Sequence, residues 1–191
     1  MIDLCNKLID NDLTKNDLLE RVEIRKTSAE DFEAICKTLA KAFDLSSPNE
    51  AAFQLRNSIA RLDESIKLVD KYTGDIYGLL IFCDYPITMG SPIMLKEREL
   101  GLFLDGFKQL NGHSFIIDER LRNCGLDKKM LYFNTDFIKE NYDLLWIGVE
   151  HTLKSHKYWQ RLGFVEVFRI EEAIFYMIPL SENMIKNYLL L

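Results

Sequence analysis

The chain has 191 residues, 48% of them hydrophobic and 28% charged, which suits one globular domain with a substantial core. Its formal net charge of −6 argues against a nucleic-acid-binding protein, because no basic stripe offsets that charge. No apolar run approaches the roughly 18 residues of a membrane span. The N-terminus also lacks the basic-then-apolar layout of a signal peptide, so we expect a cytoplasmic protein that does not bind membranes.

The beginning of the chain predicts two helical segments around a short strand. Residues 1–21 space their leucines in an imperfect helical pattern and are expected to form a helical extension. Val22–Lys26 alternates like a strand. Ser28 and Asp31 have the spacing of a capping box, so we expect a helix to begin there.

The next segments predict a second helix and a β-hairpin. Ser46-Ser47-Pro48 ends the preceding helix, and a helix is expected over 49–62. The apolar runs Ser65–Lys71 and Ile76–Cys83 are separated by the turn sequence Tyr72-Thr73-Gly74-Asp75, which is typical of a hairpin.

The second half of the chain alternates between predicted helices and strands, without repeats or low-complexity tracts. The helix expected over 126–139 has Leu126, Met130, Phe133 and Phe137 on one face. The other expected elements are a helix over 94–110, strands over 113–118 and 144–150, a helix over 154–162, a hairpin of 165–170 with 173–178, and a helical tail from Ser181. The sequence therefore predicts one mixed α/β (α+β) domain.

The four cysteines are scattered along the chain without the spacing of metal ligands. Each lies in an apolar or helical stretch, so we expect free thiols, no disulfide framework and no metal site. The four are Cys5, Cys36, Cys83 and Cys124.

A polar turn between the strand at 113–118 and the helix at 126–139 carries the strongest functional signal. Arg122, Asn123, Cys124, Gly125 and Leu126 lie where the turn becomes the helix. Backbone N–H groups at a helix start lack intrahelical partners, and the helix dipole places partial positive charge there. The turn therefore predicts a phosphate cradle and an anionic ligand.

Two motifs and the order of the elements resemble the GCN5-related N-acetyltransferase (GNAT) superfamily. The acetyl-CoA turn of that family reads Arg/Gln-x-x-Gly-x-Gly/Ala, and Arg122 and Gly125 match its first and fourth positions. Tyr158-Trp159-Gln160-Arg161-Leu162-Gly163-Phe164 resembles the family's helix that ends in a Leu-Gly-Phe turn. The resemblance covers residues 22–180, and the expected fold is a mixed sheet with splayed central strands flanked by helices. Residues 181–191 would pack on the same domain.

The resemblance implies acetyl-CoA as the co-substrate. Its pantetheine arm would pair with Phe115, Ile116 and Ile117 before the turn, in a gap left where Trp146–Val149 splays away. The pyrophosphate would bind the N–H groups of the turn, and the polarising backbone N–H would lie near Ile117. The cofactor-binding residues implied in this way are Phe115, Ile116, Ile117, Arg122, Asn123, Cys124, Gly125, Leu126, Asp127, Ser155 and Trp159.

Two positions depart from the family pattern. Asp127 stands where the family has Gly or Ala, and its carboxylate would repel a pyrophosphate unless it pairs elsewhere. Trp159 stands where many members have the tyrosine that protonates the departing thiolate, while Tyr158 is its neighbour. Because one residue turns a helix by about 100°, Tyr158 is either that acid or a residue of the core or rim.

The catalytic candidates are Glu150, His113 and Tyr158, with His151 as a further candidate base beside Glu150. We expect acetyl transfer to the primary amine of a small molecule or peptide by direct attack on the thioester. The alternative is a non-catalytic acyl-CoA-binding or interaction domain on the same fold, suggested by Asp127 and Trp159. A third possibility is an unrelated α/β binding protein. The sequence leaves open whether the protein is a monomer or a homodimer.

Overall fold

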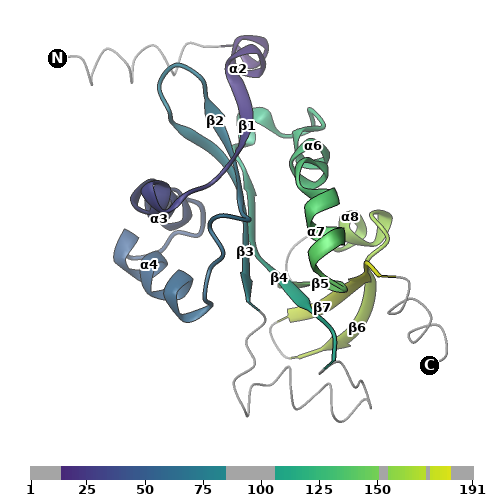
Figure 1. Cartoon of the computed structure of the whole chain (residues 1–191). Helices are drawn as coiled ribbons and strands as arrows, with labels where there is room; N and C mark the ends of the chain where they lie inside the picture. Colours follow the sequence, from purple (N-terminus) through teal and green to yellow (C-terminus); the bar gives the residue numbers. More distant parts are fainter. Residues whose placement is uncertain (1–13, 85–105, 151–154, 171–172, 182–191) are drawn as a thin grey trace.

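A mixed β-sheet organises the molecule (Figure 1). The computed structural model describes residues 14–84, 106–150, 155–170 and 173–181. Within these ranges the seven strands lie in the order β1-β2-β3-β4-β5-β7-β6, and all neighbours are antiparallel except the parallel pair β4 and β5. The strands are β1 (Val22–Lys26), β2 (Ile66–Asp70), β3 (Ile76–Asp84), β4 (Gln109–Ile117), β5 (Leu144–Glu150), β6 (Val165–Arg169) and β7 (Ala173–Pro179).

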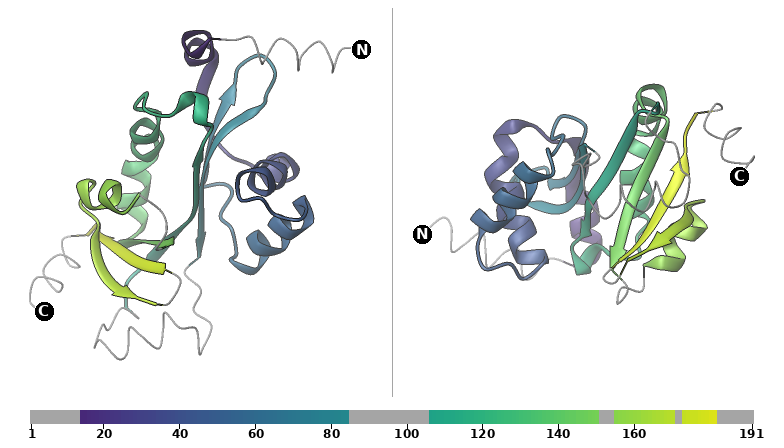
Figure 2. Two further views of the ribbon diagram at one scale, coloured as in Figure 1. Left: turned by 180° about the vertical axis from the view of Figure 1, so that it is seen from behind. Right: turned by 90° about the horizontal axis from the view of Figure 1, so that it is seen from below.

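Helices cover both faces of the sheet (Figure 2). Helices α3 and α4 pack on one face, and α6, α7 and α8 lie on the other. The helices are α2 (Lys15–Arg21), α3 (Phe32–Ala42), α4 (Pro48–Asn57), α6 (Leu126–Phe133), α7 (Thr135–Asn141) and α8 (His156–Arg161), with 3₁₀ turns at Ala29–Asp31 and Glu119–Leu121. No helix in the described ranges is long and apolar enough to cross a membrane.

Local signals place the first helices. The Asp31 carboxylate accepts hydrogen bonds from the Ser28 backbone N–H at 2.8 Å and from its hydroxyl at 3.1 Å, as the capping pattern predicts. Ser47 caps α4 through the Glu50 N–H, and Pro48 occupies its first position. The expected strand Val22–Lys26 and both expected hairpins are confirmed.

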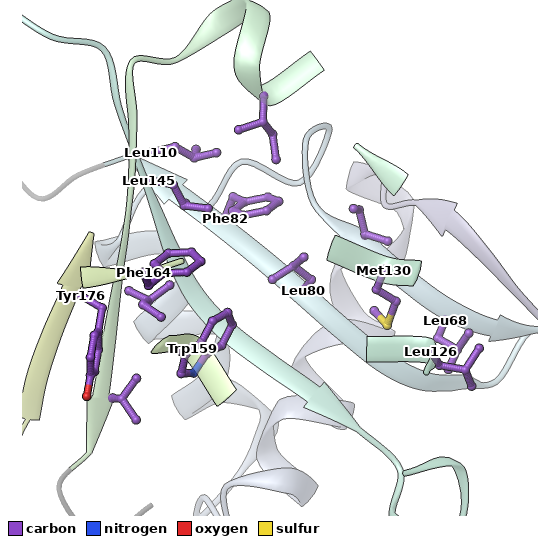
Figure 3. Close-up of a cluster of buried hydrophobic side chains, with 14 of the residues drawn as sticks. Leu68, Leu80, Phe82, Leu110, Leu126, Met130, Leu145, Trp159, Phe164 and Tyr176 are labelled. Atoms are coloured by element: carbon purple, nitrogen blue, oxygen red, sulfur yellow. The ribbon is translucent and has the colours of Figure 1, made fainter. Parts of the chain in front are cut away.

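Apolar side chains fill the space on both sides of the sheet. The largest cluster lies between the sheet and α6, α7 and α8, and Figure 3 shows Leu80, Met130 and Trp159 within it. A second cluster joins Ile35 and Leu39 of α3 to the opposite face of β3. The expected mixed α/β fold is confirmed.

Two expected helices end earlier than the sequence predicts. Helix α4 stops at Asn57, because Ile59 takes a positive φ of 53° and Ala60 bridges to Cys83 of β3. The helix expected over 126–139 breaks at Asn134, whose buried amide donates to the Glu64 backbone carbonyl at 3.1 Å. Phe133, the last residue of α6 before the break, is 48% exposed instead of buried.

A third prediction is wrong at its C-terminal end. The helix expected over 94–110 would include Gln109 and Leu110, but these residues begin β4 and pair with β5. The rest of that prediction over 94–105, the extension over 1–13, the tail from residue 182 and His151 lie outside the described residues.

Candidate functional site

The two central strands run side by side and then separate. β4 and β5 pair from Gln109↔Leu144 to Gly112↔Ile147, and no pairs follow although both strands continue. Trp146 and Ile147 are therefore still paired with β4, so the expected splay over Trp146–Val149 begins later, after Ile147.

A β-bulge lies where the strands separate. Ile81 of β3 faces Ser114 while Phe82 faces Gly112, which leaves His113 of β4 without an opposite residue. The extra residue of a bulge is unpaired in the ladder and locally redirects the strand. The bulge thus frees backbone at the opening between β4 and β5.

The opening holds a cavity of about 330 Å³, which we call the splay cavity. Its walls come from β4, β5, α8, the end of α3 and β3, and they are mainly apolar. The lining residues are Phe43, Leu80, Gly112, His113, Ser114, Phe115, Ile147, Gly148, Val149, Glu150, Ser155, Tyr158 and Trp159.

Trp159 forms the aromatic wall of the splay cavity. It is 7% exposed, and its ring centroid lies 5.7 Å from Phe115, 5.3 Å from Tyr158 and 5.4 Å from Phe164. Figure 3 shows it within the main core. Trp159 therefore shapes the cavity by packing, and its position supports the prediction that it contacts the ligand.

Tyr158 places a protonated hydroxyl at the same cavity. Burial, followed by the nearby Asp127 carboxylate, raises the pKa of Tyr158, so the phenol stays neutral at physiological pH. The hydroxyl oxygen is buried, and no group in the described residues meets hydrogen-bond geometry with it. A buried hydroxyl without a partner costs free energy, which favours a ligand that supplies one.

Two candidate bases face the splay cavity. Burial lowers the pKa of His113 below its usual 6.5, so the imidazole is neutral at pH 7, and Nδ1 lies 2.8 Å from the Ser114 hydroxyl. Glu150 ends β5 with an exposed side chain, and its backbone carbonyl is 3.0 Å from His156 Nε2. All three catalytic candidates of the sequence analysis that fall in the described residues thus line one cavity.

The turn before α6 has the conformation of an open cradle. Asn123 and Gly125 have positive φ values of 61° and 74°, and Gly125 is the N-cap of α6. Among the described residues, and apart from its chain neighbours, no atom lies within 4 Å of the position that a Cβ on Gly125 would take, so that side of the turn is open. Arg122 Nε donates to the Ile117 carbonyl at 3.2 Å and fixes the turn to the end of β4.

Asp127 lies in the first turn of α6, with its carboxylate near the Tyr158 hydroxyl. The Tyr158 phenol is neutral, so its proximity does not offset the charge that a pyrophosphate would meet at Asp127.

A second cavity of about 840 Å³ lies beside the splay cavity, on the face of the sheet that carries α3. We call it the cationic cavity because Lys37, Lys41, Arg120 and Arg122 line it, with Asp118 and Glu119 as its acids. Ile116 and Ile117 line this cavity and not the splay cavity. The remaining lining residues are Thr38, Ala42, Ile76, Tyr77 and Gly78.

Sequence reasoning missed four residues of the splay cavity: Phe43, Leu80, Gly112 and Ser114. Gly112 carried a readable signal, because a glycine inside a strand marks a bulge or a close approach. A Cβ there would lie 3.0 Å from the Ile147 side chain. Phe43 and Leu80 showed no such signal, since both fit an apolar core pattern.

The cysteines described, Cys36, Cys83 and Cys124, are free, and no metal-binding group of three or more His, Cys, Asp or Glu occurs among the described residues.

Comparisons with known proteins match the fold and not the sequence. No family model and no curated protein sequence matches the chain. Solved structures do match: the GNAT family N-acetyltransferase YhbS from Escherichia coli, in complex with CoA, is 20% identical over 86% of this chain and 84% of that chain, with a TM-score of 0.58.

Two further structures have different acceptors in their names. FeeM, an N-acyl amino acid synthase from uncultured soil microbes, is 18% identical over 85% of this chain and 92% of that chain, with a TM-score of 0.61. The ribosomal-protein-S18-alanine N-acetyltransferase from Escherichia coli is 14% identical over 84% of this chain and 94% of that chain, with a TM-score of 0.53. With its splayed central strands and its turn at the start of α6, the chain has the fold of the GCN5-related N-acetyltransferase superfamily.

Proposed function

We propose that the protein is an acetyl-CoA-dependent N-acetyltransferase that acts on a primary amine. The observation that carries this proposal is the splay cavity, which brings the bulge at His113 together with the neutral phenol of Tyr158. The turn at Gly125 follows the same strand, β4, and begins α6. The similar structures named as N-acetyltransferases, one of them in complex with CoA, support an acyl-CoA donor.

The turn and the end of β4 would hold the donor. The N–H groups of Asn123 to Asp127 lie at the positive end of α6, where phosphate oxygens are stabilised, and the turn is open on the Cβ side of Gly125. Phe115, Ile116 and Ile117 lie on the β4 segment beyond the last β4–β5 pair, so its edge is open to the pantetheine amides. Ser155 and Trp159 would close the opposite side from α8.

The reaction needs a polarised carbonyl, a free amine and a proton for the leaving group. The amine nitrogen forms a bond with the acyl carbon, the carbon–sulfur bond breaks, and the thiolate takes up a proton. Backbone at the bulge around His113 would polarise the carbonyl in this proposal, and the backbone N–H near Ile117 stays the other candidate. Tyr158 would be the acid, because its protonated hydroxyl lies at the cavity wall.

The different environments of His113 and Glu150 suit them to different roles. The lowered pKa of His113 keeps the imidazole unprotonated at pH 7, so it can accept a proton from the substrate ammonium. Glu150 is exposed at the rim and would attract the cationic amine before attack. We assign His113 as the base and Glu150 as the group that guides the amine.

One observation favours the second candidate, a domain that binds acyl-CoA without catalysis. Asp127 keeps a negative charge in the turn, since its neighbour Tyr158 is neutral. Charge repulsion there would weaken phosphate binding. An Asp127→Asn variant should therefore bind acetyl-CoA more tightly than the wild type under either function.

Turnover separates the two candidates. Acetyl-CoA is incubated with a panel of primary amines, and release of free thiol is measured for the wild type and for Tyr158→Phe. We expect kcat to fall by about 10²-fold in Tyr158→Phe with unchanged acetyl-CoA binding in calorimetry. Tyr132→Phe, on an exposed tyrosine of α6, is the matched control. Binding without turnover of any amine would support the non-catalytic domain, and absence of binding would contradict both.

A further inference from the structure

The cationic cavity differs in charge from the rest of the molecule. Its wall holds four cations and two acids, Asp118 and Glu119, a local balance of +2, while the whole chain has a net charge of −6. A concave surface of one sign in an oppositely charged protein concentrates ligands of the other sign. The cavity is therefore suited to an anion.

The four cations are not equally engaged. Arg120 binds the Asp118 carboxylate through two nitrogens at 3.0 and 3.1 Å, so these two charges largely offset each other. Lys37 pairs with Glu33 at 2.7 Å on the exposed surface of α3, where such pairs are weak.

The two remaining cations are Lys41 and Arg122. Lys41 makes no ion pair within the part of the chain that the structure describes. Burial raises the pKa of the Asp118 carboxyl, but Arg120 and, to a smaller extent, the charge of Lys41 lower it overall. Arg122 uses Nε for the Ile117 carbonyl and leaves its exposed guanidinium at the wall of the cavity. Both can bind an anion without breaking an ion pair within the described residues, and Glu119 is the acid that lines the cavity with them.

The cationic cavity adjoins the splay cavity along two elements. Lys41 and Ala42 line the first, and Phe43 of the same helix end lines the second. On β4, Ile116 lines the first and His113 the second. Three residues of a strand span roughly 10 Å. A ligand can therefore present an amine in one cavity and an anion in the other.

We propose that the acceptor of this protein carries an anionic group, a carboxylate or a phosphate, which binds in the cationic cavity to Lys41 and Arg122. The amine of the same molecule lies in the splay cavity, and roughly 10 Å separates the two groups. This inference rests on the proposed N-acetyltransferase function and adds the acceptor's chemical class to it.

Matched acceptor pairs test the proposal. The first pair is 6-aminohexanoate and 6-aminohexanamide, and the second is 6-aminohexyl phosphate and 6-aminohexanol, so the two pairs distinguish a carboxylate from a phosphate at a similar reach. Thiol release from acetyl-CoA is measured over a range of acceptor concentrations. We expect the anionic member of at least one pair to have a KM at least tenfold lower than its neutral partner.

The variant Lys41→Met locates the effect in the cavity. It should reduce the advantage of the anionic acceptor to about twofold, and Lys41→Arg should keep most of it. The KM of acetyl-CoA should not change. Lys139→Met, on an exposed lysine of α7 across the sheet, is the matched control and should keep the full advantage. Thermal melts check that the variants are folded.

Each other outcome has one meaning. Equal KM values within both pairs would overturn the proposal and leave the acetyltransferase function intact. A raised KM for acetyl-CoA in Lys41→Met, with the anionic advantage intact, would show that the cavity holds a donor phosphate and would also overturn it. If acetyl-CoA binds but no amine reacts, calorimetry measures the affinity of the same acceptor pairs for the wild type and for Lys41→Met. Tighter binding of the anionic member that is lost in Lys41→Met would support the proposal, and equal affinities within both pairs would overturn it. Failure of acetyl-CoA to bind the wild type would instead count against the proposed function.

Discussion

The two cavities share α3 and β4 but differ in how their walls are built. The splay cavity is walled by side chains of the core, such as Trp159 and Leu80, which are almost fully buried. The cationic cavity is walled by exposed or half-exposed charges on α3 and the segment after β4. The walls of the splay cavity are therefore part of the core that stabilises the fold, and the walls of the cationic cavity are side chains on its surface.

Because of this difference, the two cavities should respond differently to mutation. A change in the wall of the splay cavity alters packing, so it affects folding and donor binding together. A change in the wall of the cationic cavity alters a solvated charge, so it affects the ligand with little effect on folding.

Trp159→Ala should cause the largest loss of stability. Removing a buried Trp side chain leaves a cavity among Phe115, Tyr158 and Phe164, which typically costs about 3–5 kcal/mol. Lys37→Ala, in the cationic cavity, should change the free energy of unfolding by less than about 0.5 kcal/mol. Urea denaturation measures both. Similar losses for the two variants would contradict the division between core wall and surface wall.

Gly125→Val should affect stability moderately and donor binding strongly. Gly125 has a φ of 74°, and a β-branched residue there costs about 1–3 kcal/mol. The added side chain would also occupy the clear space in front of the turn, so acetyl-CoA affinity should fall tenfold or more in calorimetry. Gly74→Val is the control, because Gly74 has a φ of 78°, is equally open and lies in the β2–β3 turn. It should lose similar stability and keep its affinity.

His113→Gln should remove the acid limb of the pH profile. Burial lowers the pKa of His113, so the imidazole becomes protonated only below its usual 6.5. In the wild type, kcat/KM should therefore fall with an apparent pKa below 6.5, by about tenfold per pH unit. The variant should be slower and lack this limb. If the limb persists in His113→Gln and disappears in Glu150→Gln, Glu150 is the base.

The same shift affects stability with a defined sign. The unfolded chain binds a proton at His113 more readily than the folded protein does. The contribution of His113 to stability is therefore fully present above pH 6.5 and is lost as the pH falls through its lower folded pKa. Urea denaturation of His113→Gln should show a smaller decrease between pH 7 and pH 5 than the wild type.

Most of the fold could be predicted because its signals are local. The capping pair Ser28 and Asp31, the hairpin turn at Gly74 and the alternating strands each act within a few residues. The failures are long-range. The break at Asn134 depends on the backbone carbonyl of Glu64, seventy residues earlier, so no pattern within the helix predicts it.

The candidate site shows the same contrast between local and long-range features. The turn at Arg122 and Gly125 and the α8 motif were found from sequence, because residue type and spacing define them. The splay cavity also needs Phe43 from the end of α3, and the approach of Asp127 to Tyr158 joins α6 to α8. The cationic cavity combines residues from α3, β3 and the segment after β4, which only the sheet order brings together.

Ionic strength should give the smallest effect and the most direct comparison of the two cavities. The charges on Lys41 and Arg122 are exposed, and the screening length falls from about 10 Å at 0.1 M salt to about 3 Å at 1 M. The KM of an anionic acceptor should therefore rise several-fold between 0.05 and 0.5 M KCl, while that of its neutral partner stays nearly constant. The pair 6-aminohexanoate and 6-aminohexanamide, assayed by thiol release, measures this difference. An equal response of both members would mean that the salt acts on the donor or the turn, since those contacts are common to both reactions.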